Sequence, residues 1–491
     1  MVFEELTNRD RGNRFNALWG HGRHSSIFKT SRHAKIPRAK TLGLDAPGRR
    51  WQVRRAMHTD LTPLLGRTLA EGKTKCIIEK KDDPSRVILL AKDDITAGDG
   101  AKHDVIPDKG RIATQTACNV FRLLKDSQIP VAFDAQGGPD WFIAPNCQML
   151  PYEVVTRREA HGSFLKRAPH LAKGHLFSKL VVEFFLKTQD RRWHEHDLTC
   201  DDPYMIWNEA EATISLFHPA LPFATQQPFL VLADSEVFSQ PGESALFGEM
   251  SRRARQTFLV LEKAWQLEGR KLVDMKVEFG RDPAGQLLLA DVIDNDSWRV
   301  LEDGAYIDKQ IYRDGGELSD VVRSYQHVES ITARFRLPRQ RVILWAGSPT
   351  DDLGPLAEAV ARLSEGLVPT IQIACSVHKE PVRGMLELAR LTQEQPDCVI
   401  IACIGMSNGA GPTLSAATSV PVITIPAHYA SFPDDVWSSL RTPSKVPVMT
   451  VLNPTNAALA ALGILALHNP QLHACLRYSI EERGTNVVVL E

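Results

Sequence analysis

Residues 271–296, with the sequence KLVDMKVEFGRDPAGQLLLADVIDND, carry the clearest folding signal in the chain. The first half alternates apolar with charged residues, which is typical of a half-buried strand. Asp-Pro-Ala-Gly at 282–285 has the composition of a turn. A hairpin centred between residues 284 and 285 places Glu278 opposite Asp291, so two carboxylates would face each other across the sheet.

Two like charges opposed across a sheet are unfavourable, so this pair needs a counter-ion or a different register. A bound Mg²⁺ would remove the conflict, because it prefers hard oxygen ligands such as carboxylates and phosphates. An exposed hairpin with a slipped register is the alternative. The polar run DNDSWR at 294–299 follows the hairpin, in a loop position of the kind that often carries function.

Two further motifs upstream of the hairpin suggest that anions bind in this region. In LAEGKTKCIIE, residues 69–79, a glycine lets the backbone approach phosphates while Lys73 and Lys75 neutralise them. In EVVTRREAHGSFLKR, residues 153–167, two arginines and a Gly-Ser turn suit carboxylate and phosphate groups. A solvated turn and a solvated charged face are the alternatives for these two motifs.

The chain divides into two blocks with different patterns of expected strands and helices. Residues 65–315 mix alternating strands, turns and a few helices, which indicates an α+β fold. A helical pattern from 318 to 331 is expected to end near Pro338, and we place the domain boundary and linker at 336–340. Residues 341–491 alternate short apolar strands with helices and close on a long C-terminal helix, which indicates a parallel α/β fold. The stretch 205–248 reads as a loop-like insertion.

Composition excludes several classes of protein. With 491 residues, 43% hydrophobic and 24% charged, the chain builds sizeable cores and is not disordered as a whole. Its longest apolar run is too short to span a bilayer, so no membrane association is expected. Eight cysteines without metal-ligand spacing argue against a zinc site and favour a reduced, cytoplasmic location.

The net charge of −1 is the sum of a basic N-terminal segment and an acidic remainder of the chain. Residues 1–64 hold 13 Lys+Arg and 5 Asp+Glu, so the rest of the chain is acidic and no nucleic-acid partner is expected. We interpret 1–64 as a flexible basic extension. A transit peptide and an alternative start at Met57 remain open.

Motifs of the first block occur in an order that closely resembles SAICAR synthetase, across about 65–335. They are EGKTK, GDGAK, EVVTRREAHGSFLKR, EFFLK followed by DDP, LVDMKVEFG, ADVIDNDSWR and DKQIYRD. The resemblance implies an ATP-grasp-like fold and the ATP-driven ligation of aspartate to the carboxylate of CAIR, a phosphoribosyl aminoimidazole carboxylate. It also implies roles for individual residues: Lys73 and Lys75 at the ATP phosphates, Gln148, Met149 and Leu150 at the adenine, Glu278 and Asp291 at Mg²⁺, Arg157, Ser163 and Arg299 at CAIR or aspartate, and Asp202 at the aspartate amine.

Three motifs of the second block follow successive strands: AGSPTDD at 346–352, SVHK at 376–379 and GMSNGAGP at 405–412. Small and hydroxyl residues at the carboxyl end of a strand favour phosphate binding, and neighbouring strand ends share one crevice. A plain turn and a structural histidine are the alternatives. No GxGxxG follows the first strand, which argues against a dinucleotide-dependent oxidoreductase.

This block resembles AIR carboxylase of the animal type, across about 341–491, with a three-layer, Rossmann- or flavodoxin-like parallel sheet. The resemblance implies carboxylation of aminoimidazole ribonucleotide (AIR) by CO₂ as substrate, without biotin, and a homo-octamer. His378 is the candidate base, because imidazole accepts protons near neutral pH. By resemblance Lys379 is catalytic beside it, and Lys379 and Ser407 bind the CO₂ and the carboxylate. The resemblance also places Ser348, Thr350 and Asp351 at the ribose phosphate, and Asn408 and Gly409 in the same AIR and CO₂ site.

The second block also departs from its family pattern. Val377, Glu380 and Met406 replace the usual Ala, Gly and Arg, and Pro349 replaces a small polar residue. Losing the arginine could weaken anion binding or a subunit contact. A synthetase whose second block is only an oligomerisation scaffold is therefore the alternative to a bifunctional enzyme.

Overall fold

The computed structural model describes residues 61–97, 102–238 and 242–484. The predicted basic extension, apart from residues 61–64, lies outside the described residues, as does most of the GDGAK motif.

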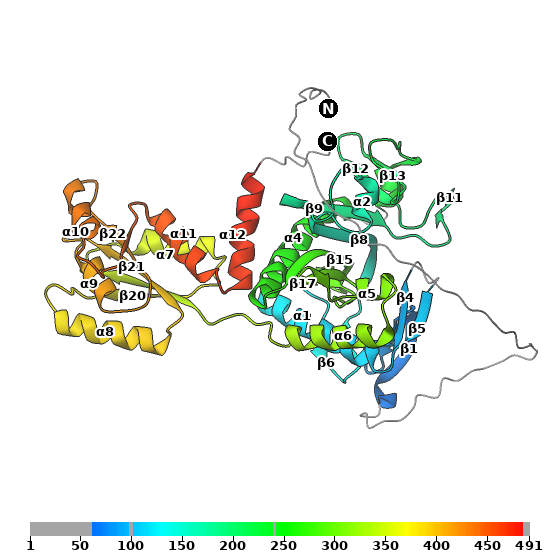
Figure 1. The fold of residues 1–491 in the computed structure, drawn as a ribbon, viewed down its shortest axis with the longest axis horizontal. Helices are drawn as coiled ribbons and strands as arrows, with labels where there is room; N and C mark the ends of the chain where they lie inside the picture. The colour runs from blue at the N-terminus through cyan, green and yellow to red at the C-terminus, as the bar shows by residue number, and fades with distance from the viewer. Residues whose placement is uncertain (1–60, 98–101, 239–241, 485–491) are drawn as a thin grey trace, which may run out of the picture. The chain divides into compact units, whose positions relative to one another are not determined.

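The first block is built on two antiparallel sheets (Figure 1). The smaller sheet has the strand order β1-β2-β3-β7-β6, and its β1–β2 turn carries Lys73. Its elements are η1 (Thr62–Leu64), β1 (Leu65–Glu71), β2 (Lys75–Lys80), β3 (Asp83–Ala91), β6 (Ala135–Gln136) and β7 (Trp141–Pro145). Helix α1 (Lys109–Asp126) packs Val120, Phe121 and Leu124 into the same core as Phe142 of β7. A separate hairpin joins β4 (Asp94–Ala97) to β5 (Lys102–Val105).

The larger, nine-stranded sheet has β8 and β15 at its centre. In spatial order its strands are β14 (Leu230–Ala233), β13 (Thr213–Phe217), β12 (Tyr204–Asn208), β9 (Leu176–Leu186), β8 (Gln148–Glu159), β15 (Lys271–Arg281), β17 (Trp298–Glu302) and β18 (Ala305–Tyr306), with β16 (Leu287–Ala290) on β15. Helix α4 (Glu243–Leu267) contributes Phe258, Leu261 and Trp265 to the core of this sheet. The minor elements are α2 (Phe164–Arg167), β10 (Arg192–Trp193), β11 (His196–Asp197), α3 (Asp234–Val237) and α5 (Gln310–Arg313).

The predicted hairpin forms, but its predicted register is wrong by one residue. Glu278 pairs with Ala290 rather than with Asp291. The Asp282 carboxylate accepts two backbone N–H groups inside the turn, at 2.9 and 2.8 Å, and these bonds centre the turn on a single residue. Asp291 therefore lies just beyond the end of β16, with a φ of 64°. The two carboxylates remain neighbours, but they are not directly opposed.

The stretch 205–248 is not a loop-like insertion, which corrects that prediction. It contains β12, β13 and β14, which extend the large sheet from β9, and the start of α4. Ile214, Leu216 and Leu232 are buried in the main core. The prolines between these strands suggested a loop, but the apolar positions of the short strands find their partners only across the sheet.

Helix α6 (Leu318–Thr332) buries Val321, Tyr325, Val328 and Ile331, four of the residues that predicted it. It ends at Thr332, several residues ahead of Pro338. Residues 335–340 have no regular structure and lead into the second block, and 336–340 stays the predicted linker.

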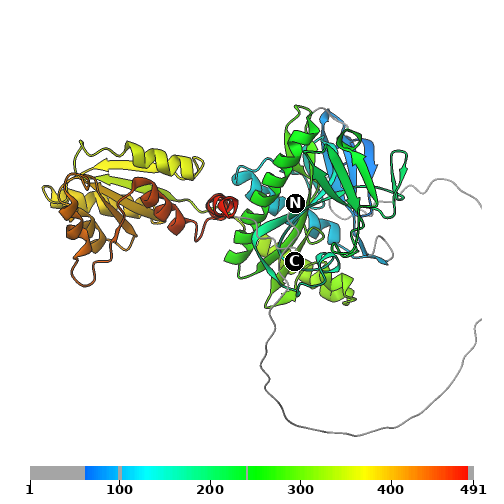
Figure 2. The same ribbon diagram turned by 90° about the horizontal axis from the view of Figure 1, so that it is seen from above.

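The second block is a three-layer α/β fold. Its parallel sheet has the order β20-β19-β21-β22-β23, and its helices form separate cores on the two faces (Figures 1 and 2). The strands are β19 (Arg341–Ala346), β20 (Thr370–Ala374), β21 (Cys398–Ile404), β22 (Val422–Pro426) and β23 (Met449–Thr450). On one face lie α7 (Gly354–Leu363) and α11 (Pro454–Leu465), and on the other α8 (Pro381–Glu394) and α9 (Ala410–Ala416). Loop elements η2 (Pro433–Val436) and α10 (Trp437–Leu440) follow β22.

The expected long C-terminal helix is two helices, α11 and α12 (Pro470–Arg483). Asn469 interrupts them and caps α12 by accepting the N–H of Leu472 at 3.0 Å, and a proline follows at the first helical position. Helix α12 packs on α4, and Glu481 accepts the N–H of Leu180 at 2.9 Å and pairs with Arg158 at 2.8 Å. The last helix therefore joins the core of the first block. Among the described residues, no helix is long and apolar enough to cross a membrane.

Candidate functional site

A cavity of about 450 Å³ opens on the polar face of the large sheet. Because side chains alternate along a strand, Asp274, Lys276 and Glu278 of β15 all line it. Other polar side chains reach it from β8, β17, the β1–β2 turn and the loop after β16: Lys73, Lys75, Glu153, Arg157, Ser163, Asp291, Asp294, Asp296, Arg299, Lys309 and Arg313. Two-thirds of the predicted synthetase residues thus converge on one charged cavity.

The predicted metal ligands, Glu278 and Asp291, are both in contact with lysine side chains. Lys187 and Lys276 donate to Glu278 at 2.7 and 3.1 Å, and Lys75 pairs with Asp291. Burial alone would raise the pKa of Glu278, but the two lysines outweigh it and hold the pKa below its usual range. Burial lowers the pKa of Lys75 to about 8. The ionised oxygens on Glu278 and Asp291 are hard ligands of the kind that Mg²⁺ takes, so the donor set fits that ion.

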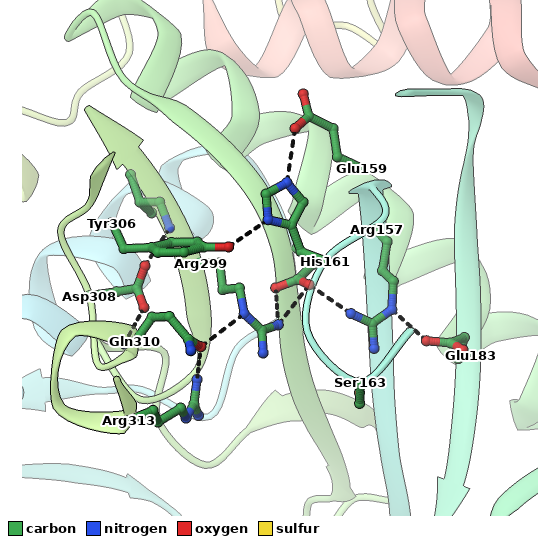
Figure 3. A network of polar contacts seen from close by, with 12 residues as sticks. Arg157, Glu159, His161, Ser163, Glu183, Arg299, Tyr306, Asp308, Gln310 and Arg313 are labelled. Atoms are coloured by element: carbon green, nitrogen blue, oxygen red, sulfur yellow. Dashed lines mark hydrogen bonds and ion pairs between the residues drawn. The ribbon is translucent and has the colours of Figure 1, made fainter. Parts of the chain in front are cut away.

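Arg157 and Arg299 share one carboxylate at the floor of the cavity (Figure 3). Arg157 donates to Asp274 at 2.6 Å and to Glu183 at 2.5 Å, and Arg299 donates to Asp274 at 2.8 Å. Burial alone would lower the pKa of Arg157, but Glu183 and Asp274 outweigh it and raise the pKa. Carboxylates therefore hold both guanidinium groups in fixed positions, which suits the recognition of an anionic ligand.

The turn before α2 lies against one of these arginines. Gly162 has a φ of +56°, and a Cβ at this position would lie 2.2 Å from Nη2 of Arg299. Only glycine allows the backbone to approach the guanidinium this closely. Ser163, which comes next, lines the cavity.

A second cavity of about 370 Å³ adjoins the first and is less polar. The two cavities share Lys75, Glu278 and Asp291. Apolar side chains from β2, β3, β7 and β8 line the second cavity: Ile77, Val87, Leu89, Ala144 and Met149. An apolar slot that opens onto a charged cavity has the character of a nucleotide site, with the base in the slot and the phosphates at the shared residues.

Three predicted synthetase residues do not line either cavity. Leu150 is 1% exposed and packs in the core, and Gln148 pairs with Arg281 at the start of β8. Asp202 accepts the N–H of Thr188 at 2.9 Å, which holds the loop before β12. Of the predicted adenine segment, Met149 alone reaches the slot.

Sequence reasoning missed several cavity residues that the fold brings in. Lys309 donates to Asp296 at 2.9 Å, and Lys276 donates to Glu153 at 2.7 Å. Burial alone would raise the pKa of Asp296, but Lys109 and Lys309 outweigh it and lower the pKa. The alternation in β15 could have identified Asp274 and Lys276, since they share a face with Glu278. Glu153 and Lys309 lie inside the quoted motifs EVVTRREAHGSFLKR and DKQIYRD, but the sequence assigned no role to either residue.

In the second block, the predicted residues follow β19, β20 and β21, which are adjacent parallel strands. Their carboxyl ends meet at one edge of the sheet, as the alternation of strands and helices in the sequence predicts. Asp351 accepts the N–H groups of Gly347 and Ser348, both at 3.0 Å, and that of Gly405 at 3.4 Å. Its carboxylate thus ties two of the loops together. Ser348 and Thr350 share a hydroxyl contact of 2.9 Å, and Ser348 is half-buried while Thr350 is exposed to solvent.

The third loop is also held by internal hydrogen bonds. Asn408 is fully buried, donates to Ser439 at 2.7 Å and accepts from Thr424 at 2.7 Å. Ser407 accepts the N–H of Gly409 at 3.1 Å. The side-chain amide of Asn408 is therefore occupied by the protein and positions the loop.

His378 and Lys379 are exposed at the end of β20. Sequence reasoning missed a second histidine at this edge of the sheet, His428, which follows β22. A Cβ at Gly405 would lie 3.1 Å from the His428 ring and 2.7 Å from Asp351, so both side chains flank the same glycine. The loops after β19, β20, β21 and β22 at this edge of the sheet, called the crevice below, carry two imidazoles, hydroxyls and an ammonium group, which suit proton transfer and anion binding.

Comparisons with known proteins assign a family to each of the two blocks. The family model described as SAICAR synthetase matches residues 68–227 and 230–331, and that described as AIR carboxylase matches 341–485. The chain is 36% identical over 427 residues to the bifunctional phosphoribosylaminoimidazole carboxylase/phosphoribosylaminoimidazole succinocarboxamide synthetase of Rattus norvegicus, covering 84% of this chain and 93% of that protein. It is 39% identical over 280 residues to the phosphoribosylaminoimidazole-succinocarboxamide synthase of Chloroflexus aurantiacus, covering 55% and 98%. A solved SAICAR synthetase in complex with ADP is 26% identical, covers 55% of this chain and 98% of that one, and has a TM-score of 0.43.

Proposed function

The chain belongs to the family that fuses SAICAR synthetase to AIR carboxylase, and we propose that it performs both reactions of that family. The carboxylase forms CAIR from AIR and CO₂. The synthetase joins CAIR to aspartate with ATP and releases SAICAR, ADP and phosphate. The observation that carries the synthetase proposal is the sharing of Lys75, Glu278 and Asp291 between an apolar slot and an anion cavity.

The shared residues suit transfer of a phosphoryl group between two bound substrates. A carboxylate is a poor electrophile, and phosphorylation converts it into an acyl phosphate with a good leaving group. The aspartate amine then attacks the acyl carbon, and inorganic phosphate leaves. Lys73 and Lys75 both line the cavity, so they would offset the phosphate charge that moves during transfer.

Glu278 and Asp291 would hold Mg²⁺ at the boundary of the two cavities. When bound, the ion neutralises phosphate charge and orients the transferred group. Lys187 and Lys276 keep Glu278 ionised, so it is ready to serve as a ligand. Arg157, Arg299 and Ser163 hold the anionic groups of CAIR, since the arginines are already fixed by Asp274.

In the carboxylase, we assign the proton-transfer step to His378. The imidazole C4 of AIR is an enamine-like carbon that attacks CO₂ directly, and a base must then remove the C4 proton. His378 stands exposed at the strand end beside Lys379, whose charge would stabilise the new carboxylate. Ser348 and Thr350 offer hydroxyls to the phosphate on the neighbouring loop.

The unusual residues of the second block leave this arrangement in place. Val377 is buried against Gly384 and packs in a core, and Glu380 pairs with Arg383 at 3.1 Å on the surface. Met406 is 64% exposed. These contacts give no structural reason to regard the second block as a scaffold alone.

We further propose that the chain forms a homo-oligomer through its second block, with the octamer as the expected state. Exposed apolar side chains gather on the loops after β21 and β22, where a subunit contact would bury them: Met406, Phe432, Trp437 and Leu440. Light scattering of the purified chain tests this oligomeric state.

Cytoplasm is the proposed compartment, since all eight cysteines are free.

One assay on the full chain tests the main proposal. AIR, bicarbonate, aspartate and Mg·ATP are supplied together, and SAICAR formation is followed. Omitting ATP and aspartate should stop the reaction at CAIR, and supplying CAIR should bypass the carboxylase. Conversion of CAIR without any conversion of AIR would remove the carboxylase half of the proposal.

A further inference from the structure

His161 is buried directly behind the synthetase cavity but does not line it. It is 3% exposed, and both ring nitrogens have partners (Figure 3). Nδ1 lies 2.6 Å from the hydroxyl of Tyr306, and Nε2 lies 3.2 Å from the carboxylate of Glu159. The mechanism above does not use any of these three side chains.

The partners of His161 determine which nitrogen carries its proton. Glu159 also accepts from Lys271 at 2.8 Å, so its carboxylate acts as an acceptor on both oxygens. Nε2 therefore donates to Glu159, and Nδ1 accepts from the Tyr306 hydroxyl. Burial lowers the pKa of His161, which agrees with a neutral ring. Every polar atom of the ring is satisfied in this arrangement.

These contacts tie together strands that are distant in sequence. Glu159 ends β8, Lys271 begins β15, and Tyr306 lies on the edge strand β18. Lys173 sits over the Tyr306 ring, 4.8 Å from its centroid. The backbone of His161 is thereby anchored from two sides immediately before the turn that lines the cavity.

The turn that follows has little freedom to shift. The Gly162 backbone lies against Arg299, and the N–H of Phe164 donates to the carbonyl of His161 at 3.2 Å. Arg299 in turn bonds to Asp274, which also holds Arg157. A displacement of His161 would thus be passed to the hydroxyl of Ser163 and to the cationic groups that face the ligand.

We propose that His161, held by Glu159 and Tyr306, is a positioning residue for the anionic substrate of the synthetase. It holds the Gly162–Ser163 turn against Arg299, so the serine and the arginines are preorganised before CAIR binds. Preorganisation lowers the cost of ordering on binding and acts on affinity more than on the chemical step. This inference rests on the proposed function, since it assigns CAIR to this cavity.

Tyr306→Phe in the full chain is the first test. It removes the hydroxyl that binds His161 and keeps the ring beneath Lys173. With CAIR supplied directly, we expect the KM for CAIR to rise about tenfold, while kcat and the KM for ATP stay within about twofold. Titration of CAIR by calorimetry without ATP should show the same loss of affinity.

His161→Ala should weaken CAIR binding further, and His161→Asn should recover part of the loss, because its amide oxygen can still accept from Tyr306. The control is Tyr152→Phe, which removes a tyrosine hydroxyl that is bonded to Glu243 at 2.5 Å in the core, away from His161. It should lower the unfolding temperature without changing the KM for CAIR.

An unchanged KM for CAIR in Tyr306→Phe and His161→Ala would overturn the inference, as would an equal loss in Tyr152→Phe. A fall in kcat alone would also overturn it, because a positioning role predicts an effect on affinity. A wild-type chain that fails to ligate CAIR would instead refute the proposed function, so the two failures are distinguishable.

Discussion

The two candidate sites hold their polar residues in opposite ways. In the synthetase cavity, charged side chains hold one another: Asp274 bridges Arg157 and Arg299, and lysines surround Glu278. In the carboxylase crevice, internal hydrogen bonds hold the loops, and the proposed reactive groups His378 and Lys379 are exposed.

This difference follows from the two folds. Neighbouring strands of an antiparallel sheet present successive charged residues to one face, so a buried network can form along β8, β15 and β17. A parallel sheet offers only loop ends at its carboxyl edge, so backbone N–H groups and short polar side chains must hold the loops. We therefore expect substitutions in the synthetase cavity to disturb several charges at once, and those in the crevice to act more locally.

The largest expected effect is that of Glu278→Gln. The amide keeps the size of the side chain but removes the charge that Lys187 and Lys276 surround and that a metal would need. Ligation of CAIR should fall about a thousandfold, while carboxylation of AIR stays unchanged. Separate assays of the two half-reactions measure this, and an equal loss of both would show that the sites are not independent.

Substitution of His378 tests the crevice in the same way. His378→Asn removes the proposed base from an exposed position, so folding should be unaffected. Carboxylation should fall at least about a hundredfold, with ligation from added CAIR retained. His428→Asn is the matched control, because this second imidazole flanks Gly405 and is not assigned to proton transfer. A larger loss in the control would move the base to His428.

Asn408→Ala tests whether hydrogen bonds hold the crevice loops. It leaves the buried hydroxyls of Thr424 and Ser439 without their amide partner. We expect a loss of about 2 kcal/mol in the free energy of unfolding, measured with denaturant. Thr413→Ala, on an exposed part of α9, serves as the control and should cost less than about 0.5 kcal/mol. Equal effects would contradict the structural role of Asn408.

The smallest expected effect is that of Arg299→Lys. Lysine keeps the charge but cannot reproduce the planar contacts of arginine with Asp274 and Gln310. The KM for CAIR should rise about tenfold, and carboxylation should be unchanged. Arg323→Lys, on the exposed face of α6, controls for the substitution itself. A normal KM in Arg299→Lys would show that charge alone recognises the substrate.

Local pattern was enough to predict much of the fold. The alternation in 271–281 predicts β15, and the spacing of Val321, Tyr325 and Val328 predicts α6. The alternation of short apolar strands with helices predicts the parallel sheet of the second block. It also predicts that the loops after β19, β20 and β21 lie at one edge of that sheet. Local pattern failed at 205–248, where prolines lie between β13 and β14 and the short strands are stabilised only by pairing across the sheet.

Motif order predicted seven of the residues that line the synthetase cavity, but not the contacts that each one makes. Lys75, Arg157 and Arg299 were predicted, and all three line it. Asp274 was not predicted, although it is the carboxylate that the two arginines share. In the crevice, Asp351 and Asn408 were predicted to bind ligand, whereas their side chains bond to the protein. Polar residues at a strand end look alike in sequence whether they face a ligand or a neighbouring loop.

Chain periodicity and residue chemistry decided which faces are polar, where the strands and helices lie, and which charges are available. These properties depend on neighbours within a few residues, so they can be read locally. The hairpin register, the contact between Gly162 and Arg299, and the packing of α12 on α4 depended on the folded molecule. Each joins atoms whose separation is set by a turn's hydrogen bonds or by packing between distant segments, and no local pattern encodes that distance.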